Sequence, residues 1–413
     1  MKVSLLTLGC KVNQAESSQI AAGLVAHGCC VVDLDGNPDF CIINTCSVTS
    51  KSDYQSRQLI RRAAKAGSKV IVTGCYSELN EEAVRSMDGV AMVVANNKKE
   101  FITNKLSNIT SCKDFKIIQN VKSRHFVKVQ DGCNNACSYC VIPSARGRSR
   151  SRGINEVIEE INSAAEFYNE TVVTGIHLGT YGYDIRPKVS LAILLKTILL
   201  KTSVKRIRLS SLEVNEIDDE LVELIQEERV CKHLHIPLQS GDNRILRLMN
   251  RNYCISQFKD RLNSIFQKIP EISIGTDIIV GFPGEGEIEF TNTKSFIEDA
   301  PISYIHVFPF SPRKGTKAFE MKPRVSDVIK KQRCEILRSL GKRKKGEYMN
   351  QQVGRALDLL IEETDSDGAS VGTTGNYLKA RAYLDSPRLK DVVYVRVDEA
   401  RDGMLIGHPI GTS

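Results

Sequence analysis

The sequence predicts an α/β protein with three parts: an open parallel α/β domain, a partial (β/α)6 barrel and a small C-terminal β-barrel. Apolar strand-like runs alternate with helical patterns up to about residue 345, which is typical of parallel sheets. Beyond that point short strands follow one another with turn residues between them. A chain of 413 residues has room for more than one domain, and we place the bounds at 1–120, 121–345 and 351–413.

The composition favours a globular protein with an anionic partner. Hydrophobic residues make up 41% of the chain and charged residues 26%, which is ordinary for such proteins. No stretch approaches the roughly 18 apolar residues of a membrane helix, and the N-terminus lacks the apolar run of a signal peptide. We therefore expect a cytoplasmic protein without a membrane partner. The net charge of +8 suggests nucleic acid as the first candidate partner.

In the first 120 residues, three strand-like runs each lead to a cysteine. The runs are KVSLLTLGC, DFCIINTC and KVIVTGC, with helical segments expected at 16–27 and 54–66. Their cysteines, here called the N-terminal triad, are Cys10, Cys46 and Cys75. Ligands bind beyond the carboxyl ends of parallel strands, so the three thiols are expected to converge. Three thiolates fit an iron–sulfur cluster with one open iron, whereas a closed zinc site needs a fourth ligand. The alternative is that each cysteine packs as a small hydrophobe.

Thirteen cysteines, an odd number in a large chain without a secretion signal, argue against a disulfide framework. Seven of them show no arrangement typical of ligands, and we expect them to be structural. These are Cys29, Cys30, Cys41, Cys112, Cys231, Cys254 and Cys334.

Six strand-like runs with helical patterns between them predict the partial barrel. They are HFVKVQ, TVVTGI, KRIRLSSL, HLHIPLQ, GTDIIVGF and YIHVFPFS. Active sites of such barrels lie at the carboxyl ends of the strands. Histidines also occur near these strands, at His177, His233, His235 and His306. A lone histidine is usually a core or turn residue, so we expect none of them to bind a metal.

The stretch DGCNNACSYC follows the first of these runs, where a barrel site is expected. It holds Cys133, Cys137 and Cys140 in a CxxxCxxC spacing, here called the CxxxCxxC triad. The spacing differs from that of bacterial ferredoxins, and no fourth cysteine follows nearby. Three thiolates on a cubane cluster would leave one iron open. The alternatives are free thiols, or a zinc knuckle completed by His125.

Two basic runs and the acidic C-terminal part bear on nucleic-acid binding. RGRSRSR, at 146–152, is either a solvated face or a place where a phosphodiester backbone is held. GKRKKGEY, at 341–348, is expected to be a linker. The C-terminal strands fit a barrel of oligonucleotide-binding style. Residues 351–413 carry seven Lys and Arg against ten Asp and Glu, so RNA contact there would need a local patch or stacking on Tyr377, Tyr383 or Tyr394.

The order of these parts resembles that of the radical S-adenosylmethionine methylthiotransferases across nearly the whole chain. The motifs that carry the resemblance are GCKVNQAES, INTCSVT, VTGC, QDGCNNACSYCVIPSARGRSRS, HIPLQSG and DIIVGFPGE. The strings GCKVN, DYQSRQLIRRAAK and TGIHLGTYG look most like the branch that modifies threonylcarbamoyladenosine beside the tRNA anticodon.

The resemblance implies an enzyme with two 4Fe-4S clusters that uses S-adenosylmethionine as radical source and methyl donor. The CxxxCxxC triad would hold the cluster that cleaves S-adenosylmethionine, and the N-terminal triad an auxiliary cluster that carries sulfur. A methylthio group would be inserted at carbon 2 of N6-threonylcarbamoyladenosine. The implied partners are the tRNA anticodon stem-loop, a reductant of flavodoxin or ferredoxin type and a sulfur donor. The C-terminal barrel would be a TRAM domain.

By the same resemblance, six polar or small residues are candidates for contacts with S-adenosylmethionine: Tyr139, Gly175, His177, Ser211, Glu213 and Gln239. The alternative for each polar residue is a turn or a helix cap. The chain departs from the family in lacking its usual Gly-Gly-Glu motif within TGIHLGTYG, and in having Gly286 where relatives more often have a hydroxyl residue.

Two other functions remain open on the sequence. The same chemistry would apply to isopentenyladenosine in tRNA or to an aspartate of a ribosomal protein. A protein of another class, a non-catalytic RNA-binding protein with structural zinc sites, would also explain the cysteines and the positive charge.

Overall fold

The computed structural model describes residues 1–107 and 122–410, and it divides into two compact units. The first unit comprises the described residues before position 108 together with Gln130–Arg150 and Ser311–Phe319. The second comprises Lys122–Val129, Ser151–Phe310 and the rest of the chain from Glu320. The units cut across the three predicted domains, because the CxxxCxxC loop groups with the N-terminal residues. The domain bounds therefore stay a prediction.

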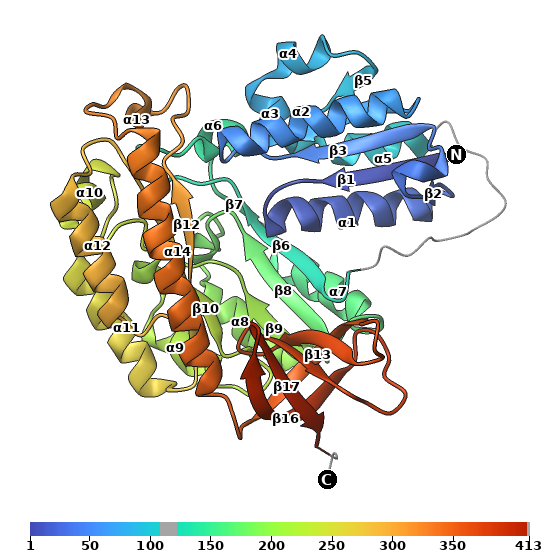
Figure 1. The fold of residues 1–413 in the computed structure, drawn as a ribbon. Helices are drawn as coiled ribbons and strands as arrows, with labels where there is room; N and C mark the ends of the chain where they lie inside the picture. The colour runs from blue at the N-terminus through green and yellow to red at the C-terminus, as the bar shows by residue number, and fades with distance from the viewer. Residues whose placement is uncertain (108–121, 411–413) are drawn as a thin grey trace. The chain divides into compact units, whose positions relative to one another are not determined.

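The first unit is built on a parallel sheet with strand order β2-β1-β3-β4-β5 (Figure 1). Its strands are β1 (Lys2–Thr7), β2 (Cys30–Val31), β3 (Phe40–Thr45), β4 (Lys69–Gly74) and β5 (Val90–Val93). Its helices are α1 (Lys11–Ala26), α2 (Ser50–Lys65), α3 (Cys75–Leu79), α4 (Glu81–Arg85), α5 (Glu100–Ser107) and α6 (Ile142–Arg146). The two helices predicted at 16–27 and 54–66 correspond to α1 and α2, which begin several residues earlier.

Alternation along the strands gives this sheet an apolar surface on both sides. Ile42 of β3 packs on one face with residues of α1 and α5. Its neighbours Cys41 and Ile43 pack on the other face with residues of α2, α3 and α4. Figure 1 shows α1 and α2 on opposite sides of the strands. Because both faces are covered, β3 and β4 contain the uninterrupted apolar runs FCII and VIV, as expected for a doubly wound sheet.

The second unit contains the partial barrel, in which the six predicted strands follow one another in chain order and one additional short strand, β7, lies at the edge beside the first of them. The structure has one sheet in the order β7-β6-β8-β9 and another in the order β10-β11-β12. A parallel bridge between Ile207 and Val230 joins β9 to the chain just before β10. The strands are β6 (His125–Asp131), β7 (Arg150–Ser151), β8 (Glu170–Gly175), β9 (Arg206–Leu209), β10 (His233–His235), β11 (Ser273–Val280) and β12 (Tyr304–Pro309). All six predicted barrel runs are therefore confirmed as strands.

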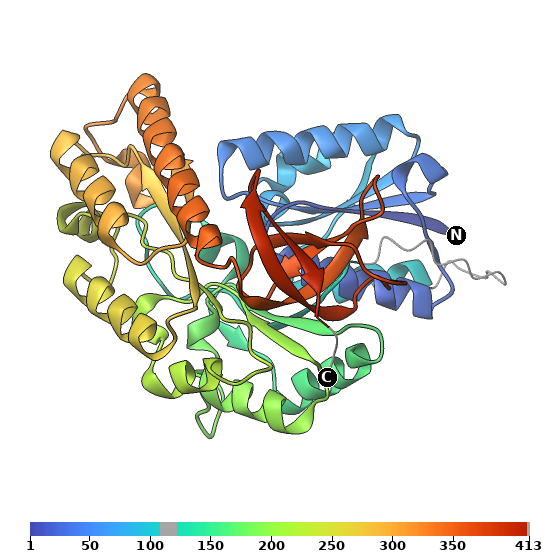
Figure 2. The same ribbon diagram turned by 60° about the horizontal axis from the view of Figure 1, so that its bottom comes forward.

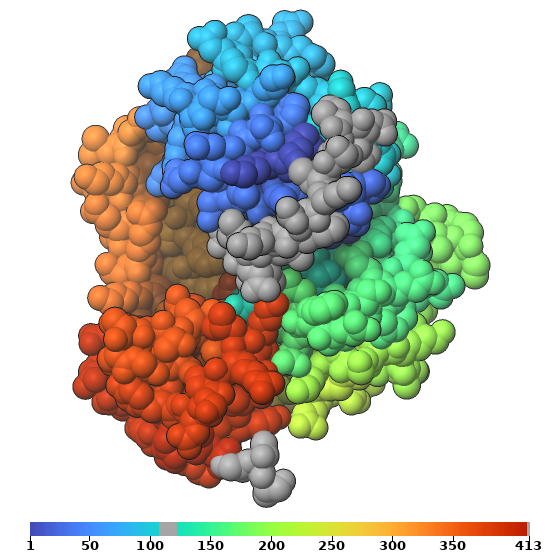
Figure 3. Space-filling view, turned by 90° about the vertical axis from the view of Figure 1, so that its right-hand side faces the viewer, coloured from blue at the N-terminus to red at the C-terminus, as the bar shows by residue number. Residues whose placement is uncertain are grey.

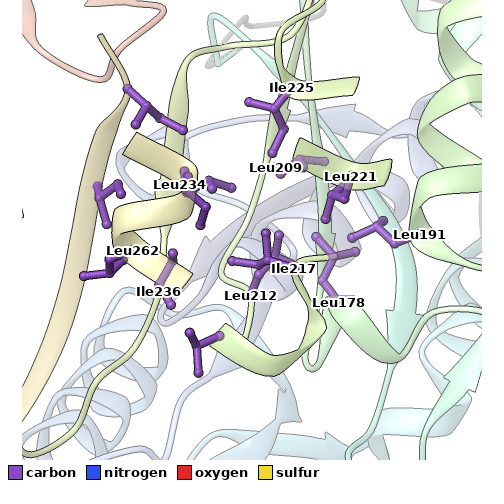
Figure 4. Packing of buried hydrophobic residues seen from close by; sticks show 14 of the residues in the cluster. Leu178, Leu191, Leu209, Leu212, Ile217, Leu221, Ile225, Leu234, Ile236 and Leu262 are labelled. Atoms are coloured by element: carbon purple, nitrogen blue, oxygen red, sulfur yellow. The ribbon is translucent and has the colours of Figure 1, made fainter. Parts of the chain in front are cut away.

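Helices cover the outer side of these strands (Figure 2). They are α7 (Ile154–Ala165), α8 (Leu191–Lys201), α9 (Asp219–Ile225), α10 (Asn243–Leu248), α11 (Ile255–Lys268), α12 (Glu287–Asp299) and α14 (Asp327–Asn350), whereas the short α13 (Lys317–Glu320) spans the division between the two units. Their apolar stripes meet the strands in one large core, in which Leu209, Leu234 and Leu262 lie close together (Figure 4). None of the helices in the described part of the chain combines the length and apolarity that crossing a membrane requires.

The predicted linker at 341–348 is wrong, because these residues belong to α14. Lys and Arg are good helix formers, and the apolar positions Leu337, Leu340 and Tyr348 are buried on one side of the helix. Gly341 lies on that side as well. A Cβ atom there would come within 2.5 Å of Ile305, so the glycine allows α14 to pack closely on β12.

The C-terminal strands form a closed barrel in the order β13-β14-β15-β17-β16, which confirms the predicted fold class. They are β13 (Ala356–Thr364), β14 (Ser370–Thr374), β15 (Lys379–Ala382), β16 (Val392–Arg401) and β17 (Met404–Pro409). The barrel has its own small core, which includes Leu359, Val395 and Leu405. In the space-filling view of Figure 3 it is the orange-red body.

A buried group of charges joins this barrel to β8 and β9. The carboxylate of Glu170 is fully buried and is paired with Arg206, with Arg208 at 3.0 Å and with Arg124 at 3.1 Å. The guanidinium of Arg208 also donates to the carbonyl oxygens of Thr374 and Gly375, both at 3.0 Å. Although burial favours the protonated carboxyl, Arg208, Arg206 and Arg124 hold the pKa of Glu170 well below its usual range.

Replacing Glu170 with glutamine is expected to lower the free energy of unfolding by about 3–5 kcal/mol, because it leaves three buried guanidinium groups without their shared anion. Urea unfolding measures this loss, and Glu159→Gln on the exposed side of α7 is the control, with an expected change within about 0.5 kcal/mol. The pKa of Glu170 is lowered in the folded state, so its contribution is complete above about pH 5 and is lost as the pH falls toward the lowered value. Equal unfolding free energies for the two variants would contradict the prediction.

Candidate active site

The N-terminal triad lies at the carboxyl ends of three neighbouring strands of the first unit. Cys46 directly follows β3, Cys75 directly follows β4 as the first residue of α3, and Cys10 precedes α1. Cys46 and Cys75 are buried, whereas Cys10 is exposed. Asn13 of α1 donates from Nδ2 to the carbonyl oxygens of Leu8 and Thr45, at 2.7 and 3.0 Å. This side chain therefore fastens the loop after β1 to the end of β3.

The backbone beside these cysteines is unusually close-packed. Gly9 has φ +105°, and a Cβ atom there would lie 3.1 Å from Cys46 Sγ. Gly74 has φ +103°, and a Cβ atom there would lie 2.3 Å from the carbonyl oxygen of Thr45. Only glycine adopts such angles without strain, and only glycine leaves this much room. The two glycines that precede Cys10 and Cys75 therefore allow the three loops to meet.

The three thiols of the N-terminal triad influence one another electrostatically. Burial raises the pKa of Cys46, and the neighbouring Cys75 and Cys10 raise it further. Burial also raises the pKa of Cys75, but the positive charge of the neighbouring Arg146 opposes this shift. The predicted convergence of the three sulfurs is thus present in the structure. Thiolates are the ligands that iron–sulfur clusters use, so this set suits such a group; its role as a ligand set stays a prediction.

The CxxxCxxC triad lies in the loop between β6 and α6, in the same unit. Gly132 has φ +72°, and a Cβ atom there would come within 2.1 Å of the carbonyl oxygen of Arg148. The backbone N–H of Cys133 donates to Gly147 O at 3.1 Å, and that of Cys140 donates to Cys137 O at 3.1 Å. The loop is therefore folded back on itself, with all three thiols partly exposed. Three reachable thiols on one fixed loop also fit a cluster with an open iron.

A buried guanidinium connects the two cysteine sets within the first unit. Arg146 is the last residue of α6, and its Nη1 lies 2.9 Å from both Glu16 Oε1 and Asp131 Oδ1. Its Nη2 donates to Asn13 Oδ1 at 2.5 Å. Although burial favours the neutral form, Cys75, Glu16 and Asp131 raise the pKa of Arg146. This side chain therefore carries a charge next to Cys75 and next to the start of the CxxxCxxC loop.

Lys99 completes this buried charge group. Its ammonium is paired with Glu16 and lies 3.3 Å from Asn44 Oδ1. Burial lowers the pKa of Lys99, with Glu16 opposing that shift. Two cations therefore face the carboxylates of Glu16 and Asp131, and the group lies immediately beside Cys75.

These contacts show that the first residue of RGRSRSR, Arg146, belongs neither to a solvated face nor to a phosphate-binding site, so both interpretations are wrong for this residue. Arg146 is 4% exposed and its charge is matched by carboxylates of its own unit. Arg148 and Arg150 are exposed, so only they and the partly buried Arg152 remain as candidates for phosphate contact. The spacing of a basic run does not reveal which arginine points inward.

The alternative of a zinc knuckle completed by His125 is not supported. His125 is the first residue of β6, whereas the CxxxCxxC loop follows its last residue. A strand rises about 3.3 Å per residue, so the histidine lies far from the cysteines along the chain direction. Its Nε2 instead lies 3.3 Å from Glu160 Oε1.

The residues predicted to contact S-adenosylmethionine fall in both units. Tyr139 lies partly buried in the CxxxCxxC loop of the first unit. In the second unit, Gly175 ends β8, His177 is paired with Glu216, and Glu213 is paired with Arg251. Ser211 is exposed beyond β9, and Gln239 follows β10 with φ +66° and donates its N–H to Asp277 O at 2.8 Å. All five second-unit residues lie at or beyond the carboxyl ends of barrel strands, and their role stays a prediction.

The remaining cysteines show no grouping like that of the two triads among the described residues. Cys112 lies outside the described residues. Cys41 is buried in β3, and burial raises the pKa of its thiol to about 11, as expected of a structural cysteine. Sequence analysis missed Glu16, Lys99 and Asp131 as neighbours of the cysteines. For Glu16 and Asp131 a signal was available, because each is a charged residue at a position that the helix or strand pattern predicts to be buried.

Comparison with known proteins agrees with this arrangement. Residues 127–297 match the family described as "Radical SAM superfamily", and residues 2–95 match the one described as "Uncharacterized protein family UPF0004". These two ranges contain the CxxxCxxC triad and the N-terminal triad, respectively.

Curated relatives match almost the full length. The threonylcarbamoyladenosine tRNA methylthiotransferase MtaB of Aquifex aeolicus is 37% identical, over 88% of this chain and 93% of its own. The protein of the same name from Bacillus subtilis is 37% identical, over 96% of this chain and 94% of its own. A tRNA-2-methylthio-N(6)-dimethylallyladenosine synthase of Fervidobacterium nodosum is 30% identical, over 90% of both chains.

Among solved structures, the radical S-adenosylmethionine methyltransferase TsrM from Kitasatospora setae has a similar fold, with a TM-score of 0.58 at 14% identity over 77% of each chain. At this identity the likeness concerns the fold alone. The two family matches and the relatives of nearly full length decide the assignment. The chain is a radical S-adenosylmethionine enzyme and belongs to the methylthiotransferase family, in the branch of the MtaB relatives.

Proposed function

We propose that this protein inserts a methylthio group at carbon 2 of N6-threonylcarbamoyladenosine next to the tRNA anticodon, using two 4Fe-4S clusters and S-adenosylmethionine. The observation that carries the proposal is the presence of two separate sets of three cysteines within one compact unit. A single radical cluster would account for only one of them. A second cluster, held by the other three cysteines, would have an open iron that could bind the sulfur before its transfer.

Different residues of the chain would bind the two clusters and S-adenosylmethionine. The CxxxCxxC triad would hold the cluster whose chemistry is the reductive cleavage of S-adenosylmethionine, and Tyr139, Gly175, His177, Ser211, Glu213 and Gln239 are the candidates to position that molecule. The N-terminal triad would hold the auxiliary cluster. The protein's part is to orient these groups and to exclude water and oxygen.

The choice of nucleoside rests on the relatives. Those named for threonylcarbamoyladenosine are 35–37% identical to this chain, and those named for dimethylallyladenosine are 29–30% identical. The anticodon loop is a suitable substrate because such loops present unstacked bases that a protein pocket can hold. The implied partners are therefore this stem-loop, a flavodoxin- or ferredoxin-type reductant and a sulfur donor.

The test is a comparison of two tRNAs with the anaerobically reconstituted enzyme. One tRNA carries threonylcarbamoyladenosine and the other isopentenyladenosine, and each is incubated with S-adenosylmethionine, a chemical reductant and sulfide. Nucleoside mass spectrometry is expected to find the methylthio product only from the first. If only the second tRNA yields the methylthio product, the proposed nucleoside is wrong and the proposed reaction type stands. A colourless protein that binds zinc and does not cleave S-adenosylmethionine would support the non-catalytic alternative instead.

A further inference from the structure

Three adjacent strands of the second unit place polar side chains together on one face. In the register of the parallel strands, His235 of β10 is opposite Gly275 of β11, and Asp277 is opposite His306 of β12. Residues two apart in a strand share a face, so Gly275 and Asp277 point the same way. The residues that alternate with them along β11, such as Ile274 and Ile278, point into the apolar core under the helices. The polar face is therefore the inner side of the partial barrel.

Two imidazoles and one carboxylate meet on this face. His235 Nε2 lies 3.0 Å from Asp277 Oδ1, and His306 Nδ1 lies 3.3 Å from the same oxygen. The ligating atoms of the three residues all lie within 4.8 Å of one another. An ion with bonds of about 2.1 Å to nitrogen and oxygen spaces neighbouring ligand atoms by about 3 Å. The side chains are thus already arranged as they would be around a cation.

The other ring nitrogen of His235 has a fixed partner. Its Nδ1 lies 3.2 Å from the hydroxyl of Tyr304, which also lies 2.8 Å from His233 Nε2. Tyr304 reaches both histidines because Gly275 has no side chain: a Cβ atom there would lie 2.0 Å from the tyrosine ring. Metal-binding histidines almost always have such a partner on the second nitrogen, because it fixes the ring and its tautomer.

The charge and accessibility of the group also suit a cation. Asp277 is the acidic member of the group, and its carboxylate faces both imidazoles. His306 has 51% of its side chain exposed, whereas His235 is nearly buried. An ion could therefore enter from the exposed side and keep positions open for water or another oxygen ligand.

We propose that His235, Asp277 and His306 bind a divalent transition-metal ion, such as Zn²⁺ or Fe²⁺, separately from the two cysteine sets. Two imidazoles and a carboxylate on one side of an ion, with the remaining positions open, form a known type of site for such metals. A trio joined by hydrogen bonds alone is the competing explanation. This inference does not depend on the nucleoside proposed above, because it rests only on three side chains of the barrel face.

The experiment measures zinc on the reconstituted holoenzyme, so that the cysteines are already occupied by iron. The protein is dialysed anaerobically against micromolar Zn²⁺ and then against buffer, and zinc and iron are counted by mass spectrometry. The wild-type protein is expected to retain one zinc ion per chain. His306→Gln and Asp277→Asn are expected to lose it with no change in iron content. His306 is exposed, so its variant is expected to fold even if the Asp277 variant does not.

The matched control is His408→Gln. His408 forms an exposed pair with Asp398 at 3.0 Å, which is a histidine–carboxylate contact without a second imidazole. This variant is expected to retain zinc as the wild type does. If the wild-type holoenzyme keeps no zinc after dialysis, or if His306→Gln keeps as much as the wild type, the metal site does not exist and the trio is held by hydrogen bonds alone. Neither result would affect the test with the two tRNAs.

Discussion

Replacing Cys46 and Cys75 with alanine is expected to abolish methylthiolation while leaving the cleavage of S-adenosylmethionine intact. Iron in the reconstituted protein should fall from about eight atoms per chain to about four, because each site is expected to hold a four-iron cluster. The reason is that these thiols, with Cys10, form one set at the ends of β1, β3 and β4, whereas the CxxxCxxC triad is fixed by its own loop. Iron analysis and the yield of deoxyadenosine measure the two effects.

Two comparison variants sharpen this result. Cys41→Ala removes a buried thiol from the same strand, β3, that leads to Cys46, and it is expected to keep both the iron and the activity. Alanine at Cys133, Cys137 and Cys140 is expected to abolish S-adenosylmethionine cleavage as well as methylthiolation. If the variant at Cys46 and Cys75 keeps the full iron content, these residues are not ligands, however near one another their sulfurs lie.

The cysteine sets were predictable because their signals are local. The CxxxCxxC spacing is contained in eight residues, and each member of the N-terminal triad follows an apolar run that is typical of a buried strand. Parallel strands bring such ends together whatever the distance between them in the sequence. The six barrel strands were predicted for the same reason, since each has its own apolar pattern, and so were four strands of the C-terminal barrel. The fifth, β14, was missed because its sequence SVGTT consists mostly of small and hydroxyl residues that are typical of a turn.

The features that were missed depend on pairing between distant residues. Arg146 looked like one member of a basic run, and only its contacts with Glu16 and Asp131 explain why it is buried. His235 and His306 looked like lone histidines, because the sequence of a single strand does not reveal the register in which β10, β11 and β12 pair. One local signal was available: Asp277 is a charged residue within an otherwise apolar strand run, and such a residue needs a partner.

The largest stability effect in the first unit is expected from Arg146→Met. The substitution keeps much of the side-chain volume but leaves Asp131 without its buried cation and Glu16 with Lys99 alone. Removing one partner from a buried charge group costs about 3–5 kcal/mol, because the remaining carboxylates lose a buried cation and gain no water in its place. Urea unfolding of the apoprotein measures this loss without involving the clusters.

Arg150→Met is the control from the same loop. Its guanidinium is half exposed and lies 4.0 Å from Asp131, so its removal is expected to change the unfolding free energy by less than about 1 kcal/mol. The two variants remove the same charge four residues apart and differ in burial, so the difference between them isolates the buried group. Arg146 also lies beside Cys75 and donates to Asn13 Oδ1, and Asn13 in turn fastens the loop before Cys10. A loss confined to Arg146→Met would therefore mean that the guanidinium holds the N-terminal triad and the start of the CxxxCxxC loop in one folded unit. Equal stabilities would mean that the two loops hold their shape independently of it.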